Sequence, residues 1–390
     1  MKKVISAAVE DAKRVALEVL LNNARAGRSG LPRTAAWGYP EPYTRDLLIG
    51  ALGTLVSENE ELVESLRAVL ETLAANQSEL GHISSLVDVP GDRGASDTTP
   101  LFLVALGMYR SATLSLTFLA DAEQKADLWM RYQSPADDVI VTQEPTSDWR
   151  DEQWVEGSGL FVNALLYCHL SQRPDVARLA TLRRHLPRLD VKRTHQEYVH
   201  DRLVGTDSPY YALWAYKDAN SERFDLLGNS IAILSGMASA ERSQAIVAWV
   251  ERECHALVAQ GELGVALPPC LFPYIRPKDP DWRPRYARYN PPGCYHNGGL
   301  WPFVCGFYVA ALVAAGELEL AREKLLALTE LVRKSRLAEK AFGFNEWLNA
   351  HDGSARGQDW QSWSASMFLY AAACVEREST PFFDVMRRPP

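Results

Sequence analysis

The sequence predicts an all-α fold in which six helical hairpins close into a ring, an (α/α)6 toroid. Helical periodicity recurs along most of the 390 residues, few segments alternate as strands do, and long loops follow roughly every second helix. No low-complexity linker divides the chain, so we expect one catalytic domain over residues 1–390. A helical solenoid, the competing all-α fold, should repeat about every 34 to 47 residues. The sequence shows no such consensus repeat.

The first helix is predicted over residues 4–25, where Val4, Ala8, Val15 and Val19 share one side and charged residues occupy the other. The same pattern predicts further helices near 44–57, 59–75, 98–110, 113–131, 157–171, 174–186, 209–217, 223–238, 241–259, 297–315, 317–335 and 360–377. Only 138–143 and parts of 265–275 look extended.

The loops between these helices carry glycine, proline and aromatic residues. They are predicted at 27–43, 81–97, 133–156, 193–208, 262–296 and 341–358. Because they recur after about every second helix, we expect them to lie at one end of the ring and to form a central pocket.

Composition excludes several classes of partner. The net charge of -8 and the pI near 5.6 argue against nucleic acid and anionic membranes, because phosphate binding needs a basic face. No uncharged apolar run approaches the length of a membrane span. Charged residues interrupt the N-terminal apolar stretch before it reaches signal-peptide length, so we expect a cytoplasmic protein. The sequence leaves open whether it forms a homo-oligomer.

Metal and redox chemistry have little support in the sequence. The six cysteines are far apart and form no CxxC pair, and several lie in apolar helical runs. His296 has no second histidine at metal-ligand spacing, so we expect it to position substrate. We predict no metal site and no cofactor.

Short loops rich in rings, amides and one carboxylate precede two apolar helical segments. They are Cys-Tyr-His-Asn-Gly-Gly-Leu-Trp-Pro at 294–302, Asn-Glu-Trp at 345–347 and Gln-Ser-Trp-Ser at 361–364. The chain also has eleven tryptophans, many of them in loops. Such residues line pockets for polyhydroxylated ligands, and we interpret them as a sugar-cleaving site.

Hydrolysis of a glycosidic bond usually needs two carboxyl groups, one to protonate the leaving oxygen and one to activate water or attack the sugar. Four carboxylates beside aromatic residues or helix starts are candidates: Asp46, Asp97, Asp151 and Glu346. Three have simpler interpretations. Asp97 before Thr-Thr-Pro suits a helix N-cap, Asp46 can pair with the adjacent arginine, and Asp151 can be a solvated loop charge.

These positions resemble the alkaline/neutral invertase family of glycoside hydrolases and, more distantly, the glucosidase part of glycogen-debranching enzymes. The run at 295–302 is similar to the invertases' Tyr-His-Asn-Gly-Gly-x-Trp-Pro, and 345–347 with 361–364 is similar to their Pro-Glu-Tyr and Gln-Thr-Trp-Ser. Weaker likenesses are Thr-Arg-Asp at 44–46, the segment 222–229, and the debranching-type Asp-Thr-Thr-Pro-Leu-Phe at 97–102. The resemblance implies an (α/α)6 toroid.

The resemblance also implies residue roles. Asp151 takes the place of the general acid, and Glu346 that of the other catalytic carboxylate. The family has Arg-Arg after its acid, where this chain has Glu152 and Gln153, and Asp148 competes for the acid's place. The residues expected to bind the sugar are Tyr43, Arg45, Asp46, Asp97, Trp149, Arg223, Tyr295, His296, Asn297, Trp301, Trp347, Gln361 and Trp363.

The function that follows is inverting hydrolysis of a small α-glucoside, with sucrose as the first candidate. A debranching-type α-glucosidase and a glucosylglycerate-type hydrolase are alternatives within the same chemistry. A sugar isomerase or epimerase on the same toroid would need a histidine pair, for which the chain offers His296 and His351. A non-catalytic carbohydrate-binding protein would keep the aromatic residues without needing Asp151 and Glu346.

Overall fold

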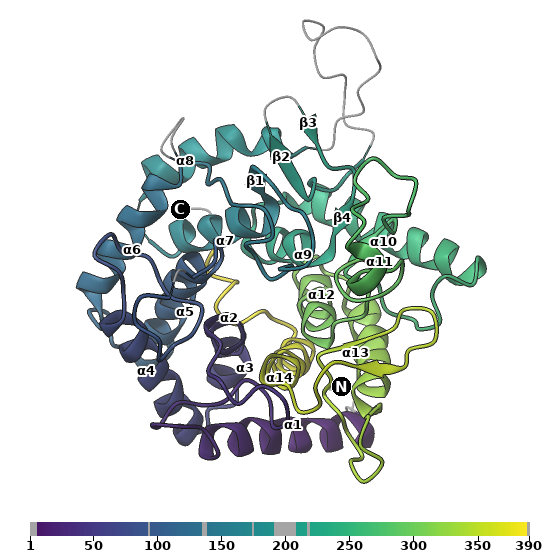
Figure 1. Ribbon diagram of the computed structural model, residues 1–390, viewed down its shortest axis with the longest axis horizontal. Coiled ribbons are helices and arrows are strands. Elements are labelled where there is room, and N and C mark those ends of the chain that lie inside the picture. Colours follow the sequence, from purple (N-terminus) through teal and green to yellow (C-terminus); the bar gives the residue numbers. More distant parts are fainter. Residues whose placement is uncertain are drawn as a thin grey trace, which may run out of the picture.

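A computed structural model of the chain describes residues 6–92, 94–134, 139–173, 175–190, 208–216 and 219–387. Its helices form two concentric rings, seen end-on in Figure 1. Each inner helix packs against the next, and the last closes the ring against the first. The predicted (α/α)6 toroid is therefore confirmed. The inner ring consists of α2 (Thr44–Ile49) with α3 (Ala51–Val56), α5 (Thr98–Thr113), α7 (Leu160–Ser171), α9 (Leu226–Ser235), α12 (Pro302–Ala314) and α14 (Ser362–Arg377).

The outer helices cover the inner ring. They are α1 (Ala7–Arg25), α4 (Glu60–Ala75), α6 (Ala120–Tyr132), α8 (Val176–His185), α10 (Ala240–Ala259) and α13 (Leu318–Arg333). The two rings differ in sequence as their burial requires. In α4 only one stripe is buried, including Leu62, Leu66 and Leu73, whereas nearly every residue of α12 is buried. An amphipathic helix covers a core and a helix that is apolar all round lies within one.

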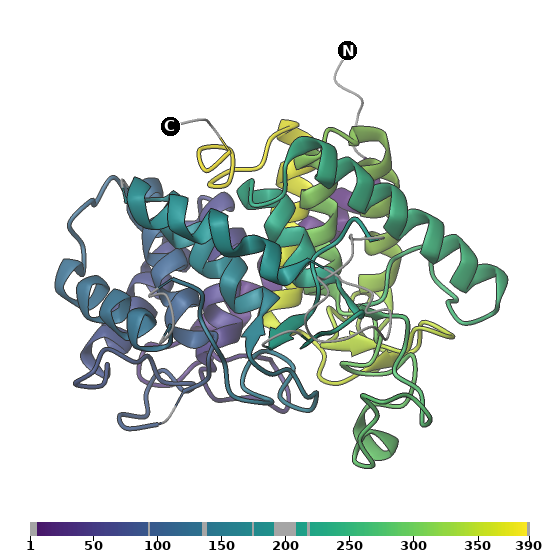
Figure 2. The ribbon, with the colours of Figure 1, turned by 90° about the horizontal axis from the view of Figure 1, so that it is seen from above.

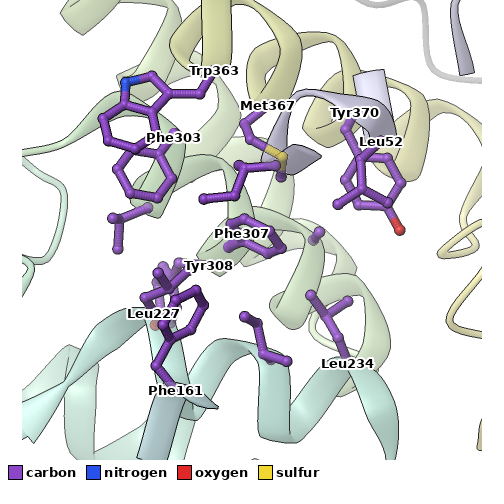
Figure 3. Close-up of a cluster of buried hydrophobic side chains, with 14 of the residues drawn as sticks. Leu52, Phe161, Leu227, Leu234, Phe303, Phe307, Tyr308, Trp363, Met367 and Tyr370 are labelled. Atoms are coloured by element: carbon purple, nitrogen blue, oxygen red, sulfur yellow. The ribbon is translucent and has the colours of Figure 1, made fainter. Parts of the chain in front are cut away.

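The core fills the space inside the inner ring. Figure 3 shows part of it, with Leu52 from α3, Phe161 from α7, Leu227 from α9 and Met367 from α14. At two crossings a glycine lets α14 approach its neighbour closely. A Cβ at Gly53 would lie 2.1 Å from the Ser366 carbonyl oxygen, and one at Gly306 would lie 2.8 Å from that of Met367. Larger residues there would push the ring open.

Short strands tie the loops to the inner helices. The strand β1 (Ser158–Gly159) pairs antiparallel with β2 (Trp214–Tyr216), which pairs antiparallel with β3 (Ala219–Asn220). Two further antiparallel pairs are β4 (Phe224–Asp225) with β5 (Leu271–Phe272), and β6 (Trp347–Leu348) with β7 (Ala355–Arg356). Ser158 faces Ala215 and Phe224 faces Phe272 in these ladders. A 3-10 turn, η1 (Leu186–Leu189), and α11 (Tyr286–Tyr289) complete the described elements. Figure 2 shows the long loops gathered at one end of the ring.

Some predicted boundaries were wrong. The helix expected at 209–217 is replaced by bends and β2, because a short apolar run fits a strand as well as a helix. The helix expected from 113 begins only at Ala120, since Leu114 and Leu119 adopt left-handed φ values of 56° and 55°. The helix expected from 297 begins at Pro302.

Of the two segments predicted to be extended, one contains a strand. Within 139–143, only Gln143 forms a bridge, opposite Gly157, whereas the extended part of 265–275 is β5. Residue 138 and most of the predicted loop 193–208 lie outside the described residues. None of the helices in the described ranges is long and apolar enough to cross a bilayer. The six cysteines are all free.

The buried carboxylate Asp127 joins three elements outside the pocket. It accepts from His169 Nε2 at 3.2 Å and from Arg178 at 2.6 Å, linking α6 to α7 and α8. Burial opposes ionisation, but these partners together hold the pKa of Asp127 well below its usual range. The stability it contributes is therefore present above the unfolded pKa of about 3.9 and is lost as pH falls through the folded pKa.

We expect Asp127→Asn to lower the free energy of unfolding by about 3 kcal/mol, because it leaves a buried arginine without its counter-charge. Urea unfolding at pH 7 measures the loss, which should shrink as pH falls below 4. The matched control is Glu71→Gln, which removes an exposed partner of Arg67 and should leave the midpoint unchanged. Equal effects of the two substitutions would contradict this account.

Candidate active site

The predicted site residues lie where the inner helices begin. Asp46 is in the first turn of α2, and α5, α12 and α14 begin directly after Asp97, Trp301 and Gln361. Asp225, which was not predicted, caps α9 through its side chain. Contacts between these residues, described below, bring the N-terminal ends of the helices to one place. Helix N-termini present free N–H groups and a partial positive charge, which favours anions and hydroxyl oxygens. The starts of the inner helices therefore form a polar cluster rich in carboxyl groups.

Two of these contacts join α2 to its neighbours. Arg45 forms a two-pronged ion pair with the fully buried Asp97, through Nε to Oδ2 at 2.5 Å and a second nitrogen to Oδ1 at 3.1 Å. Gln361 Nε2 donates to Asp46 Oδ1 at 2.9 Å. Burial raises the pKa of Asp46 to about 7, although Arg45 and Gln361 act in the opposite direction. Asp97 stands at the N-cap position of α5, as predicted, but its side chain makes no capping hydrogen bond and holds Arg45 instead.

Glu346 lies in the loop that precedes α14. Its backbone N–H donates to the Gln358 carbonyl at 2.8 Å, and the Gln358 N–H donates to Glu346 Oε2 at 3.2 Å. Gly357, at φ 66°, allows this approach, since a Cβ there would lie 2.4 Å from Oε2. Burial, followed by the negative charges of Asp46 and Asp151, raises the pKa of Glu346 to about 8. Three carboxyls therefore act on one another here.

Asp151 differs from Glu346 in its surroundings. Its side chain is 61% exposed and makes no hydrogen bond to the described residues. Partial removal from water raises its pKa, and the charges of Glu152 and Asp148 add to this, while Arg45 opposes them. An open carboxyl that keeps its proton longer than usual can donate it to a bound molecule.

The neighbouring Asp148 is held by the protein instead. It is 1% exposed and accepts from the Arg150 backbone N–H at 2.8 Å, from Gln143 at 3.2 Å and from the Arg150 side chain at 3.4 Å. Arg150 also pairs with the buried Asp225. This network fixes the loop on α9. The oxygens of Asp148 are therefore taken up by protein donors, whereas Asp151 is exposed.

Aromatic rings form a continuous wall beside these carboxyls. Tyr295 stacks on His296 with ring centroids 3.9 Å apart, and Trp149 meets Trp301 edge-on at 5.2 Å. Trp363 stacks on Phe303 at 4.1 Å, where Figure 3 shows the pair together at one end of the core. Trp347 meets the Tyr295 ring at 5.6 Å. The wall continues directly into the core.

Strained backbone places several of these groups. Tyr295, Phe344 and Trp360 have left-handed φ values of 46°, 42° and 55°, a conformation that costs about 1 to 3 kcal/mol for residues other than glycine. They lie beside His296, two residues before Glu346, and beside Gln361 respectively. Such outliers concentrate where surrounding structure imposes a functional geometry.

Two predicted sugar-binding residues make their hydrogen bonds and ion pairs to other parts of the protein. Asn297 donates to the carbonyls of Ile275 and Asn290 and accepts from the Ile275 N–H, so its amide pins two loops together. Arg223 pairs with Asp279 and Asp281 and lines a cavity of about 660 Å³ with Trp214, Trp249 and other residues. The structure gives both side chains partners within the protein.

Sequence reasoning missed Tyr39. Burial raises the pKa of its hydroxyl, and the next contributions come from Glu346, Asp46 and Asp151, so the phenol lies among the three carboxyls. Tyr43, which was predicted, responds to Asp46 and Asp151 as well, after burial and Glu41. The only signal for Tyr39 was its place in an aromatic loop before α2.

The described residues hold no group of three or more His, Cys, Asp or Glu side chains that could bind a metal ion. The assembled groups are instead carboxyls, phenols, one buried imidazole and indole faces. Their chemistry is that of proton transfer to and from a sugar oxygen.

Solved structures share this architecture. A GH63 mannosylglycerate hydrolase from Thermus thermophilus, with Tris and D-glycerate bound, superposes with a TM-score of 0.63 at 14% identity, over 92% of this chain and 99% of that one. A bacterial glucoamylase complexed with acarbose gives 0.64 at 12% identity, over 98% and 58%. At such identities the likeness establishes the fold, which is the (α/α)6 fold of glycosidases.

The sequence comparison is more specific. The family described as alkaline and neutral invertase matches residues 205–378. Cytosolic invertase 1 of Oryza sativa subsp. japonica is 29% identical over 169 residues, which are 40% of this chain and 26% of that protein. The match therefore spans about a quarter of this curated relative. Both findings support the alkaline/neutral invertase family, as the motifs predicted.

The coupling of the carboxyls can be tested directly. Because the charge of Asp46 raises the pKa of Glu346, Asp46→Asn should move that pKa down from about 8. The carboxyl ¹³C resonance of Glu346, assigned by its loss in Glu346→Gln, reports the titration. Asp352→Asn, on the exposed turn between β6 and β7, is the control and should leave it unchanged. An unshifted Glu346 in Asp46→Asn would show that the two carboxyls are not coupled.

Proposed function

We propose that this protein is an inverting glycoside hydrolase that cleaves a small α-glucoside. The observation that carries the proposal is the pair of unlike carboxyls, an open Asp151 and a buried Glu346, whose charges interact beside an aromatic wall. The (α/α)6 fold and the invertase match support the same chemistry. The substrate and the stereochemistry are our inference.

In the proposed reaction Asp151 gives its proton to the glycosidic oxygen as the bond to the anomeric carbon breaks. Glu346 takes a proton from a water molecule that attacks the opposite face of the sugar. Arg45, Asp46 and Gln361 are proposed to hold sugar hydroxyls, with Asp97 fixing Arg45. Tyr295, Trp347 and the other rings cover the sugar's C–H faces. Ionised acceptors give the strongest of these hydrogen bonds.

The raised pKa of Glu346 sets a condition on these roles. With a pKa of about 8, Glu346 is half ionised near pH 8, so the base form develops as pH rises through neutrality. Burial thus keeps a proton on Glu346 at pH values where an exposed carboxyl has lost it. Substrate binding must therefore place a water beside Glu346 and the glycosidic oxygen beside Asp151. Because Glu346 must be ionised while Asp151 keeps its proton, we expect kcat/KM to follow a bell-shaped dependence on pH.

Substitution of each carboxyl separates the two roles. Asp151→Asn should lose at least about 100-fold in kcat on an α-glucoside, which is the range for general acid catalysis, yet retain most activity on α-glucosyl fluoride, whose leaving group needs little protonation. Glu346→Gln should lose both activities, because water activation is needed in each case. The opposite pattern would exchange the roles, and full activity of both variants would refute the mechanism.

The substrate prediction is sucrose first among small α-glucosides, with little action on starch or glycogen. A short substrate enclosed on all sides can use remote hydroxyl contacts in transition-state binding. Purified protein should be assayed on sucrose, other glucosyl disaccharides, glucosylglycerate and limit dextrin. Proton NMR at early times should show β-glucose as the first product. Activity confined to dextrin would refute the substrate, and an α product would refute inversion.

Activity should also survive exhaustive dialysis against EDTA, because the proposed chemistry uses carboxyls alone and the described residues offer no metal cluster. Loss of activity that Mg²⁺, Ca²⁺ or Zn²⁺ restores would contradict a purely carboxylate mechanism. A thermal melt of the dialysed protein separates lost chemistry from lost folding.

A further inference from the structure

His296 is a buried group that the proposed reaction has not used. Its ring is fully buried, and neither ring nitrogen has a hydrogen-bond partner among the described residues. Its backbone is fixed, since its N–H donates to Asn290 Oδ1 at 2.9 Å. The ring stacks on Tyr295, and on Trp301 at 5.3 Å. Such a ring is held too firmly to turn toward another partner.

One ring nitrogen faces the proposed acid. His296 Nε2 lies 3.8 Å from Asp151 Oδ1, somewhat beyond a hydrogen bond. Because Asp151 is exposed and otherwise unbonded, a small rotation of its side chain closes this gap. Catalytic hydrogen bonds are often long in empty sites and shorten when substrate binds.

The charge state of the imidazole follows from its neighbours. Burial lowers the pKa of His296 well below its usual value, and the cations Arg150 and Arg45 lower it further. The other titratable groups around it are Asp151, the stacked Tyr295 and Cys270, whose thiol donates to the His296 carbonyl. The ring is therefore neutral and carries a single N–H.

A buried N–H is costly without an acceptor, whereas an unpaired ring lone pair costs less. In the described part of the chain, the acceptor facing a ring nitrogen is Asp151 Oδ1. The proton of the imidazole thus belongs on Nε2.

We propose that His296 is a positioning residue for Asp151: its Nε2–H donates to Oδ1, so the acidic proton sits on Oδ2, toward the glycosidic oxygen. This inference rests on the acid role proposed above. During the reaction the Oδ2 proton moves to the leaving oxygen, which also takes the electron pair of the broken C–O bond. Water supplies the new C–O bond and gives its proton to Glu346. The N–H of His296 then stabilises the Asp151 carboxylate until solvent reprotonates it.

Two variants separate the N–H from the ring. His296→Phe keeps the stack on Tyr295 and Trp301 but removes the donor, and His296→Gln keeps a donor near the position of Nε2. We expect His296→Phe to lose 10- to 100-fold in kcat on the glucoside that the wild type cleaves, because general acid catalysis contributes about 10² to 10⁴ and His296 supports only part of it. On α-glucosyl fluoride, which needs little protonation, the loss should be less than 3-fold. His296→Gln should recover most of the loss. His351→Phe, at an exposed position, is the control.

The pH profile gives a second readout. Removing a donor from the carboxylate destabilises its ionised form, so the alkaline limb of kcat should move to higher pH in His296→Phe. Equal losses on glucoside and fluoride would reveal a structural role and overturn the proposal. A shift of the limb to lower pH would mean that His296 accepts from Asp151, and would overturn it as well.

A third measurement is independent of activity. The ¹⁵N shifts of His296, assigned by their loss in His296→Gln, should show a protonated Nε2 and a bare Nδ1 in the wild type. They should also respond to Asp151→Asn. The reverse tautomer overturns the proposal even if the protein hydrolyses no glycoside. Absence of wild-type activity on both substrates would instead refute the proposed function.

Discussion

The site depends on the removal of several carboxylates from water at the place where six helices begin. Burying a carboxylate is costly unless counter-charge and hydrogen bonds replace its hydration. Two buried arginines supply the counter-charge. Arg45 ties Asp97 to α2. Arg150, in the loop before α7, pairs with Asp148 of the same loop and with Asp225 at the start of α9. Among the described residues Asp46, Asp151 and Glu346 form no ion pair with an arginine, and their raised pKa values suit them to exchange protons.

The aromatic wall and the core are one packed structure. Trp363 and Phe303 belong to the first turns of α14 and α12, so the rings at the end of the core also form part of the pocket's wall. Close packing transmits small displacements with little loss. A substitution deep in the ring, such as one at Gly306, would therefore displace side chains at the site. This coupling explains why strained residues such as Tyr295 can be held in place.

Much of this could be predicted from the sequence. The inner and outer helices follow from periodicity. The loop motifs predicted roles for Asp151, Glu346 and the aromatic residues, whose side chains the structure brings near one another. Sequence could not separate Asp148 from Asp151, because the difference lies in solvent exposure and in the hydrogen bonds that Asp148 accepts from Gln143 and Arg150. Nor could it show that Asn297 holds backbone groups or that Arg223 pairs with Asp279 and Asp281. Tyr39 was missed because its neighbours come from distant loops. The short helix predicted at 209–217 failed because periodicity is ambiguous over few residues.

The contact between Asp46 and Gln361 joins residues 315 positions apart. At synthesis rates of about 5 to 20 residues per second, on the order of tens of seconds pass between the emergence of the two. Throughout that interval α1 and α3 lack α14, against which both pack. The apolar faces of α1 and α3 that pack against α14 therefore stay uncovered in the nascent chain until α14 has been made. The ring therefore closes only after α14 has been synthesised, and these faces need shielding until then.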